Sequence, residues 1–411
     1  MTNAHNPRRR LGEVLYALSF AGAYLGFMPL LMLLLPRRIV VVAPGHAFST
    51  LSGLLVLGGV VAGLANIAAG AIGDAWFTRH GSRRAVIAVG LGGLVASYAL
   101  LAISTTVPAL AASLVCFQVM LNLMLAPLGA VMTDYVPDAR KGHVAGWLNA
   151  GLPASILMVT AIALIAPADG VGGYVVVAAL VAGLVVPLLA VWPFDTVNLA
   201  PNDQTLHAIG GRRVIDRRDL VLAALARLLM QLGGALMVNY LFLYLVSLRT
   251  SARVESIPEP SAAVGTLALV AGGASICGAL VAGHGSDSKR RRKSPMIVAA
   301  LAVALALLLT ANPLSWPIMV VSYGAFQAAL TAYLAIDTAL VAQLLGKHPR
   351  RGTVQGLMNL TNTLPAICVP MLALLSNTQT PDLVTLSRLI IASALAPVIA
   401  ASLVGWIRSI P

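Results

Sequence analysis

The stretch Gly70–Arg84 reads GAIGDAWFTRHGSRR and separates two long apolar runs, Leu51–Ile72 and Ala85–Ile103. Either run is long enough to cross about 30 Å of hydrocarbon as a helix. The stretch between them is therefore predicted to be the turn between two membrane-spanning helices. This turn carries one aspartate and three arginines, namely Asp74, Arg79, Arg83 and Arg84.

The composition of the chain argues against a soluble protein. Of its 411 residues, 59% are hydrophobic and only 10% are charged, whereas soluble domains carry about 25% charged residues. So few charges cannot cover a large soluble protein, and a multi-span membrane protein is the class that fits. The net charge of +13 would suggest a nucleic-acid partner for a soluble protein. Here the basic residues fall in short loops, where they orient the helices, so we expect no nucleic-acid partner.

No pattern of reactive residues indicates an enzyme. The sequence shows no nucleophile–base arrangement and no phosphate-binding loop above chance, so we expect neither catalytic residues nor a cofactor. The cysteines Cys116, Cys277 and Cys368 each lie inside an apolar run. Because no cluster of His, Cys and carboxylate residues has metal-ligand spacing, we expect no disulfide and no metal site.

Apolar runs predict twelve membrane-spanning helices. They cover residues 11–35, 51–73, 85–104, 108–133, 142–166, 171–192, 220–247, 261–284, 295–311, 316–345, 352–375 and 387–407. We interpret the longest polar stretch, 193–219, as a cytoplasmic linker. It divides the chain into an N-terminal six-helix half, 1–192, and a C-terminal six-helix half, 220–411. The fold class is predicted to be an all-α membrane protein.

Two motifs recur about half a chain apart. A second basic turn, Gly283–Pro295, again has a small-residue helix end followed by an aspartate, Asp287, and a basic cluster. Asp287 follows Asp74 by 213 residues, and the segment RKGHVAGWLN (140–149) recurs after 210 residues as RRGTVQGLMN. Two repeats in one order, at nearly one offset, indicate two parallel halves.

The first turn, G-x-x-G-D-x-x-x-x-R-x-G-x-R-R, resembles the loop between helices 2 and 3 of the major facilitator superfamily. Its spacing is most similar to the sucrose and glycoside–pentoside–hexuronide cation symporter branch. Further segments similar to that branch are LLLPRRIVVVAP (33–44), TDYVPDARKG (133–142), ARLLMQLGGALMVNYLFLYL (226–245), AIDTALVAQLL (335–345) and GLMNLTNTLPA (356–366). The resemblance covers nearly the whole chain. It implies a central cavity lined by helices 1, 4, 7 and 10, and sugars or glycosides that move together with a cation.

The resemblance also implies a lock at the cytoplasmic face. The candidate residues of this lock are Asp74, Arg83, Arg140, Asp287 and Arg350. Asp74 is expected to face the start of span 11, and Asp287 the start of span 5, when that face is closed. The chain departs from the family pattern at Gln343, which stands at the position matching Asp134, so the second half lacks one acid. The alternative is that the loop only fixes topology.

Polar side chains on the cavity helices are candidates for substrate binding. They are Gln118, Asn122, Gln231, Tyr240, Tyr323 and Gln327. Gln118 and Asn122 are four residues apart and therefore share one helix face. All six can hydrogen-bond hydroxyl or amide groups of a ligand. The alternative is that each joins two helices, where such a bond contributes about 0.6 kcal/mol.

Arg227 and Asp337 are the two charges that are predicted to lie deepest in the membrane. Arg227 follows Asp219 by eight residues, and Asp337 precedes Gly346 by nine. At 1.5 Å per residue, both lie roughly 12–13 Å below the same face. An isolated charge at the centre of a span costs about 2.5–3.5 kcal/mol. We therefore predict that the two face each other and that Asp337 is the protonation site. The alternative is a permanent structural ion pair.

These patterns predict a secondary active transporter for a small polar solute, coupled to protons and working by alternating access. Its partners would be the solute, protons and the lipid bilayer, and we expect a monomer. Most Lys and Arg residues fall on one side, which places both termini in the cytoplasm and the protein in the cell (inner or plasma) membrane. Two alternatives stay open. One is efflux of an amphipathic compound, and the other is a non-transporting receptor with the same fold.

The loop after span 7 provides a test of this orientation. A cysteine introduced at Ser251 should react with an impermeant maleimide from outside the cell, because the segment Arg249–Pro260 is predicted to be external. The labelling is measured in a background where the three native cysteines are replaced by alanine. Labelling of position 251 from the cytoplasmic side only would contradict the topology.

Overall fold

The computed structural model describes residues 7–136, 138–165, 171–192, 217–251, 254, 257–289, 293–345, 351–375 and 383–408. These residues form helices joined by short turns, without a strand in the described part. The first half of the chain contributes α1 (Pro7–Pro29), η1 (Leu30–Leu34), α2 (Leu35–Val42), η2 (Pro44–His46), α3 (Ala47–His80), α4 (Arg84–Ile103), α5 (Val107–Tyr135), α6 (Asp138–Ile165) and α7 (Gly172–Val191). The second half contributes α8 (Arg217–Thr250), α9 (Pro260–Lys289), α10 (Lys293–Ala311), α11 (Trp316–Leu345), α12 (Arg351–Leu375), α13 (Leu383–Ser393) and α14 (Leu395–Trp406).

The predicted all-α membrane fold is confirmed. Each predicted span corresponds to one helix, except the first, which combines α1, η1 and α2, and the last, which combines α13 and α14. Ten described segments are long and apolar enough to cross a membrane. Helices α6 and α12 contribute shorter apolar stretches, Ala154–Leu164 and Leu364–Leu375. Helix α8 begins at Arg217, so it includes the last three residues of the predicted linker, 193–219. Residues 193–216 lie outside the described part, and the linker stays a prediction.

The first span contains a π-helical segment, η1, that the sequence reading did not predict. Leu35 donates its backbone N–H to Leu30 O, five residues back. Pro36 has no N–H to continue the ordinary pattern, which loosens the helix at this point. The Tyr174 hydroxyl of α7 donates to Leu34 O over 3.1 Å. The hydrogen bond from Tyr174 therefore ties α7 to the end of the π-helical segment.

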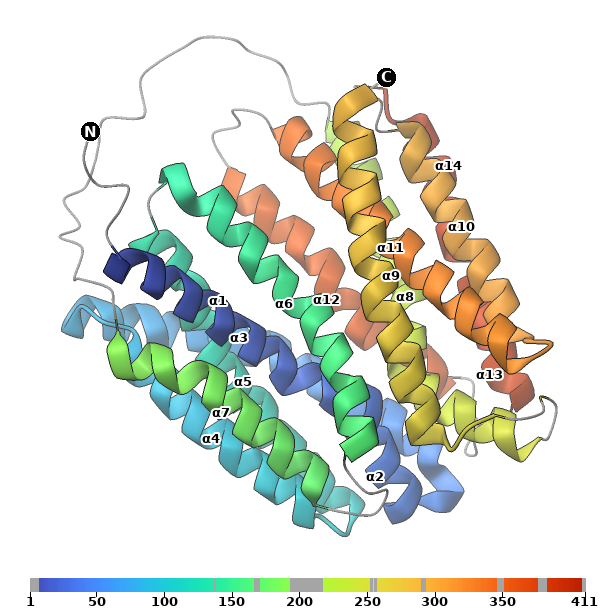
Figure 1. Cartoon of the computed structure of the whole chain (residues 1–411), viewed down its shortest axis with the longest axis horizontal. Coiled ribbons are helices and arrows are strands. Elements are labelled where there is room, and N and C mark those ends of the chain that lie inside the picture. Colours follow the sequence, from blue (N-terminus) through green and yellow to red (C-terminus); the bar gives the residue numbers. More distant parts are fainter. Residues whose placement is uncertain are drawn as a thin grey trace.

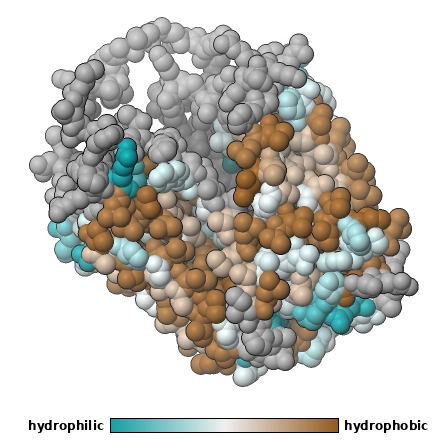
Figure 2. Space-filling view, in the orientation of Figure 1, coloured by the Kyte–Doolittle hydropathy of each residue, from teal (hydrophilic) through white to brown (hydrophobic). Residues whose placement is uncertain are grey.

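The helices form two groups (Figure 1). In the first, α1 packs against α6 and α7, and α5 packs against α3 and α4. In the second, α11 packs against α9 and α10, and α14 packs against α8 and α10. Apolar side chains cover much of the visible surface (Figure 2), as a protein surrounded by lipid requires. We call the face where α1 begins and α14 ends the terminal face, and the other the opposite face.

A close seam joins the two groups, between α3 and α12 and between α6 and α9. Glycines allow this approach. A Cβ on Gly59 would lie 2.7 Å from Ile367, and one on Gly272 would lie 2.5 Å from Leu157. Such distances leave no room for a Cβ unless the facing side chain moves. The backbone of one half therefore lies directly against side chains of the other, as small residues allow in membranes.

Two hydrogen bonds also cross this seam towards the opposite face. Ser52 Oγ on α3 and Tyr240 Oη on α8 lie 2.7 Å apart, and both residues are buried. Thr160 Oγ1 on α6 donates to Gly265 O on α9 over 2.7 Å. Phe48 adds a ring contact to Tyr240, with centroids 5.0 Å apart. These contacts hold the two groups together where α3 and α9 begin.

The neighbouring glycines of α9 test the seam. Gly272→Ala should open the seam, because its Cβ would overlap Leu157, whereas Gly273→Ala is a matched control with nothing within 4 Å. Both changes give the same gain in helix propensity, so their difference reports the clash. Overpacking of roughly 1–3 kcal/mol would shift the equilibrium about 5- to 150-fold towards opening of the opposite face.

The measurement is the rate of maleimide labelling of a cysteine placed at Ser52 in purified protein. Faster labelling with Gly272→Ala than with Gly273→Ala is expected. Equal rates in the two variants would mean that the seam does not control access to this position.

Candidate functional site

Arg227 on α8 and Asp337 on α11 meet inside the membrane-spanning region. Arg227 Nη1 lies 3.5 Å from Asp337 Oδ2. The Asp337 side chain is fully buried, and that of Arg227 is 14% exposed. The structure thus brings together the two charges that the sequence placed at matching depth. Each offsets the desolvation of the other, which neither helix alone could do.

The pair is not a closed ion pair. Charge-assisted hydrogen bonds are about 2.7–2.9 Å long, and the 3.5 Å contact is looser. Both Asp337 oxygens, Arg227 Nε and the Tyr333 hydroxyl are buried without a hydrogen bond in the described part of the chain. Tyr333 precedes Asp337 by one helical turn and so lies on the same face of α11. The site therefore contains polar groups that are ready for a further partner.

Other predicted contact residues extend along the same two helices. Gln231 follows Arg227 by one turn on α8 and is half-buried. Tyr323 and Gln327 are buried on α11, again one turn apart. These side chains give α8 and α11 neutral hydrogen-bonding groups in addition to the two charges.

Three other predicted contact residues, Gln118, Asn122 and Tyr240, contact a neighbouring helix in the structure. Asn122 Nδ2 on α5 donates to Gln118 O over 2.8 Å, and Asn66 Nδ2 on α3 donates to Asn122 Oδ1 over 3.1 Å. Gln118 Nε2 lies beside Gly58 of α3. Tyr240 belongs to the seam described above. Their substrate-binding role stays a prediction, because the bonds described are those expected of side chains that join helices.

The first basic turn forms a compact charged triad around Arg83. Gly81 ends α3 with a φ of 67°, which lets the chain turn back at once. Arg83 Nη2 donates to Asp74 Oδ1 over 2.8 Å, and its Nε donates to Asp134 Oδ2 over 2.6 Å. Its guanidinium also lies 4.8 Å from the centroid of the Phe77 ring. The loop, α3 and α5 are therefore tied together at the terminal face.

The two carboxylates of the triad differ in exposure. The Asp134 side chain is 17% exposed and that of Asp74 is 70% exposed, around an arginine that is 5% exposed. Burial opposes the charge of Arg83, but the hydrogen bonds that it donates to both carboxylates, together with their negative charge, outweigh burial and raise its pKa above the ordinary value. Asp134 is a partner of Arg83 that the sequence reading missed, although it noted the position opposite Gln343.

The predicted pairing of the lock across the two halves lies outside the described part. The side chains of Arg140 and Asp287, and the whole of Arg350, are not among the described residues. Asp74 and Arg83 are described, and their partners belong to the first half. The lock between Asp74 and the start of span 11 stays a prediction.

A second polar cluster, which sequence reasoning missed, lies where α8 and α10 begin and α14 ends. The fully buried Asp219 accepts the backbone N–H of Arg408 at Oδ2 over 3.0 Å. Lys293 Nζ donates to Ile407 O over 3.1 Å. These two groups belong to one peptide unit, so a carboxylate and an ammonium hold it from both sides. We call this arrangement the peptide clamp.

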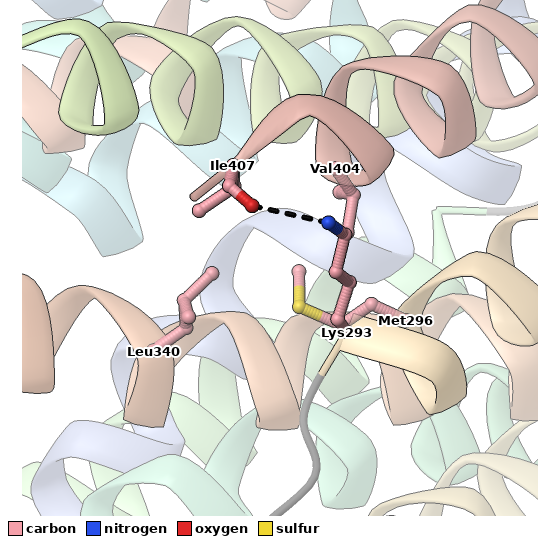
Figure 3. Close-up of a pocket in the computed structure, with 5 residues that line it drawn as sticks. All are labelled: Lys293, Met296, Leu340, Val404 and Ile407. Carbon is pink, nitrogen blue, oxygen red and sulfur yellow. Dashed lines mark hydrogen bonds between the residues drawn. The ribbon is translucent and has the colours of Figure 1, made fainter. Parts of the chain in front are cut away.

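A small pocket adjoins the peptide clamp. Figure 3 shows its lining, which consists of Lys293, Met296, Leu340, Val404 and Ile407. Most of these side chains are apolar, and Lys293 is occupied by the backbone of α14. The pocket therefore has no free polar group to orient a solute, and we attribute it to the packing of α10, α11 and α14.

The family model of the Major Facilitator Superfamily matches residues 13–370. Among solved structures, the chain is similar to a bacterial homologue of the human lysosomal transporter Spinster in its inward-facing and occupied conformation. The TM-score is 0.72 at 16% identity, over 98% of this chain and 97% of that one. The inward-facing and unoccupied form gives 0.66 at 15%, with the same coverage. The nucleoside transporter NupG gives 0.71 at 15%, over 98% of this chain and 99% of that one. No curated protein matches the sequence.

The unequal burial of the triad leads to a stability prediction. Asp134→Asn should destabilise the protein by roughly 1–3 kcal/mol, because it weakens a largely buried charged bond. Asp74→Asn should cost about 0–1 kcal/mol, because water screens its exposed carboxylate. Thermal unfolding of the two purified variants measures the difference, and equal losses would contradict it. If Asp74→Asn also leaves the transport rate and the inward/outward balance unchanged, Asp74 is not part of a lock.

Proposed function

The chain belongs to the Major Facilitator Superfamily, and from this membership we propose that it is a secondary active transporter. It moves a small polar solute across the membrane by alternating access, and a proton that binds Asp337 supplies the coupling. The family and the fold support transport rather than enzymatic catalysis. The buried pair of Arg227 and Asp337 is the observation that carries the coupling proposal.

Two charges inside spanning helices are costly to keep unless they serve a function. Ionisable groups in such positions mark ion or substrate pathways in membrane proteins. A receptor or scaffold that had kept the fold and lost transport would have no need for them. The pair therefore favours a transporter over the non-transporting alternative.

The coupling step is a protonation that breaks the ion pair. When a proton binds, the Asp337 carboxylate becomes a neutral carboxyl group, and Arg227 loses its counter-charge. The arginine is then available to a solute or to a different arrangement of α8 and α11. When the proton leaves, the attraction between the two side chains returns. Proton binding and conformation are linked in this way because each changes the free energy of the other.

The seam supports an arrangement that is closed at the opposite face. Its glycine contacts and its two hydrogen bonds join the halves there. With both termini in the cytoplasm, this arrangement would be inward-facing. The two Spinster-homologue structures to which the chain is similar are described as inward-facing.

Sugars and glycosides are the first solutes to test, because of the resemblance to the sucrose and glycoside branch. NupG is described as a nucleoside transporter, and nucleosides likewise carry hydroxyl groups. Efflux of an amphipathic compound is the remaining alternative, and the direction of net flux under a proton gradient distinguishes it from uptake. We expect the monomer to be the transporting unit.

Removal of the Asp337 charge tests the coupling. In proteoliposomes screened with sugars, nucleosides and amphipathic compounds, Asp337→Asn should lose uphill accumulation driven by a proton gradient while exchange is retained. The reason is that the amide cannot take up and release a proton. The measurement compares uptake with counterflow at several pH values.

Thr338→Val is the matched control, because Thr338 is exposed and its hydroxyl donates to Leu334 O of its own helix. This control should behave as the wild type. Asp337→Asn leaves Arg227 without a counter-charge, so Arg227→Gln/Asp337→Asn provides a second variant if the single one fails to fold. Accumulation against a gradient by Asp337→Asn, with the pH dependence of the wild type, would show that Asp337 is not the coupling site.

A further inference from the structure

Several buried polar atoms at the ion-pair site are ready to hydrogen-bond a further molecule or chemical group. Both oxygens of Asp337, Arg227 Nε and the Tyr333 hydroxyl are buried without a hydrogen bond in the described residues. Groups in such positions are rarely left unpaired in native proteins. The Tyr333 hydroxyl is within electrostatic range of both charges. A small molecule or chemical group that entered the site would find these buried groups available as hydrogen-bond partners.

The net charge of the site limits which solute can bind together with a proton. Arg227 stays charged at every accessible pH. With Asp337 ionised, the site is neutral. With Asp337 protonated, it carries a net charge of +1 in a place where an unpaired charge is costly. A neutral solute would leave that charge uncompensated, whereas a solute with one negative charge would cancel it.

We propose that the site co-transports a proton with a monoanionic solute whose carboxylate binds Arg227. This inference rests on the proposed function and names the solute class. The site is then neutral in two states: with Asp337 ionised and no solute bound, and with Asp337 protonated and the anion bound. Proton and anion bind cooperatively because each removes the electrostatic cost of the other.

The hydrogen-bond donors of the protonated site fit a carboxylate. Arg227 offers the N–H groups of its guanidinium, and Tyr333 offers its hydroxyl. Protonated Asp337 adds an O–H donor, whereas the ionised aspartate would repel an anion. Protonation therefore adds a donor to the site and removes the negative charge of Asp337. A guanidinium and a carboxylate also form the strongest class of protein hydrogen bonds.

The helices that pack against α11 add no competing charge at this position in the described part. Helix α8 supplies Arg227, and α11 itself supplies Tyr333. Helix α10 supplies Lys293, whose ammonium donates to the backbone after α14. Helix α9 has no Asp, Glu, Lys, Arg or His in residues 260–282, and its cysteine is exposed. The pH response of the site should therefore follow Asp337.

Pairs of ligands that differ in charge but are similar in shape test this proposal. The purified full-length protein is mixed with pyruvate, benzoate or glucuronate, and each is matched with a neutral counterpart: pyruvamide, benzamide or glucose. Thermal stabilisation gives the apparent affinity between about pH 5.5 and about pH 8. At least one anion should bind, and its affinity should fall up to about tenfold per pH unit once Asp337 is deprotonated, because only the protonated fraction is competent. The neutral counterparts should show no such dependence.

Asp337→Asn imitates the protonated carboxyl permanently. It should bind the same anion with an affinity that no longer depends on pH, while Thr338→Val should keep the pH dependence of the wild type. In proteoliposomes, uptake of the anion should carry protons without net charge movement, which is measured with an internal pH dye and by membrane-current recording.

The outcomes distinguish this inference from the proposed function. If a neutral solute is accumulated with protons and with net charge movement, proton-coupled transport stands and the anion inference is wrong. The inference is also wrong if none of the three anions binds more tightly at acidic pH, or if Asp337→Asn retains the pH dependence. If neither these probes nor the sugars, nucleosides and amphipathic compounds are transported, the proposed function itself fails.

Discussion

A charge inside a lipid bilayer has no water to solvate it, and this constraint sets how α8 and α11 lie against each other. Arg227 and Asp337 are both within spanning helices, and each is the nearest source of compensation for the other. Their attraction contributes to the way in which these two helices lie against each other. The same constraint makes the site responsive, because one proton on Asp337 removes the compensation.

The contacts between the two halves are of a different kind. The seam depends on the close approach of Gly59 and Gly272 to side chains of the other half and on uncharged hydrogen bonds such as that between Ser52 and Tyr240. Breaking these contacts would expose no charge to lipid. The charged triad around Arg83 lies at the terminal face and within one half. Charge thus organises each half internally, while close packing joins the halves.

Much of the fold could be predicted because hydrocarbon imposes a length on each apolar run. The apolar runs predict twelve spans, and their ends lie within about five residues of the helix ends for all but the first two spans. This prediction rests on the bilayer thickness. The contact between Arg227 and Asp337 could be predicted from their matching depth in the membrane, because two buried charges of opposite sign offset each other's desolvation.

Other features depend on which helix faces which, and a single sequence does not encode that directly. Asp134 meets Arg83 only because α5 lies against α3 and α4. The roles of Gly272 and Tyr240 depend on the neighbour across the seam. The π-helical segment has a local signal in Pro36, but its partner Tyr174 comes from α7. The buried polar atoms of Arg227, Tyr333 and Asp337 that have no hydrogen bond in the described residues could likewise be identified only from the structure.

The peptide clamp has a consequence for the order in which the protein is assembled. Asp219 stands near the start of α8, and the backbone N–H that it accepts comes 189 residues later. A ribosome that feeds helices into the membrane in sequence delivers this carboxylate long before its partner. Until α14 has been released, the hydrogen bond from the Arg408 backbone to Asp219 cannot form. The second half therefore completes its assembly after synthesis of α14 and not helix by helix, which leaves a late intermediate with an open flank available to chaperones or to degradation.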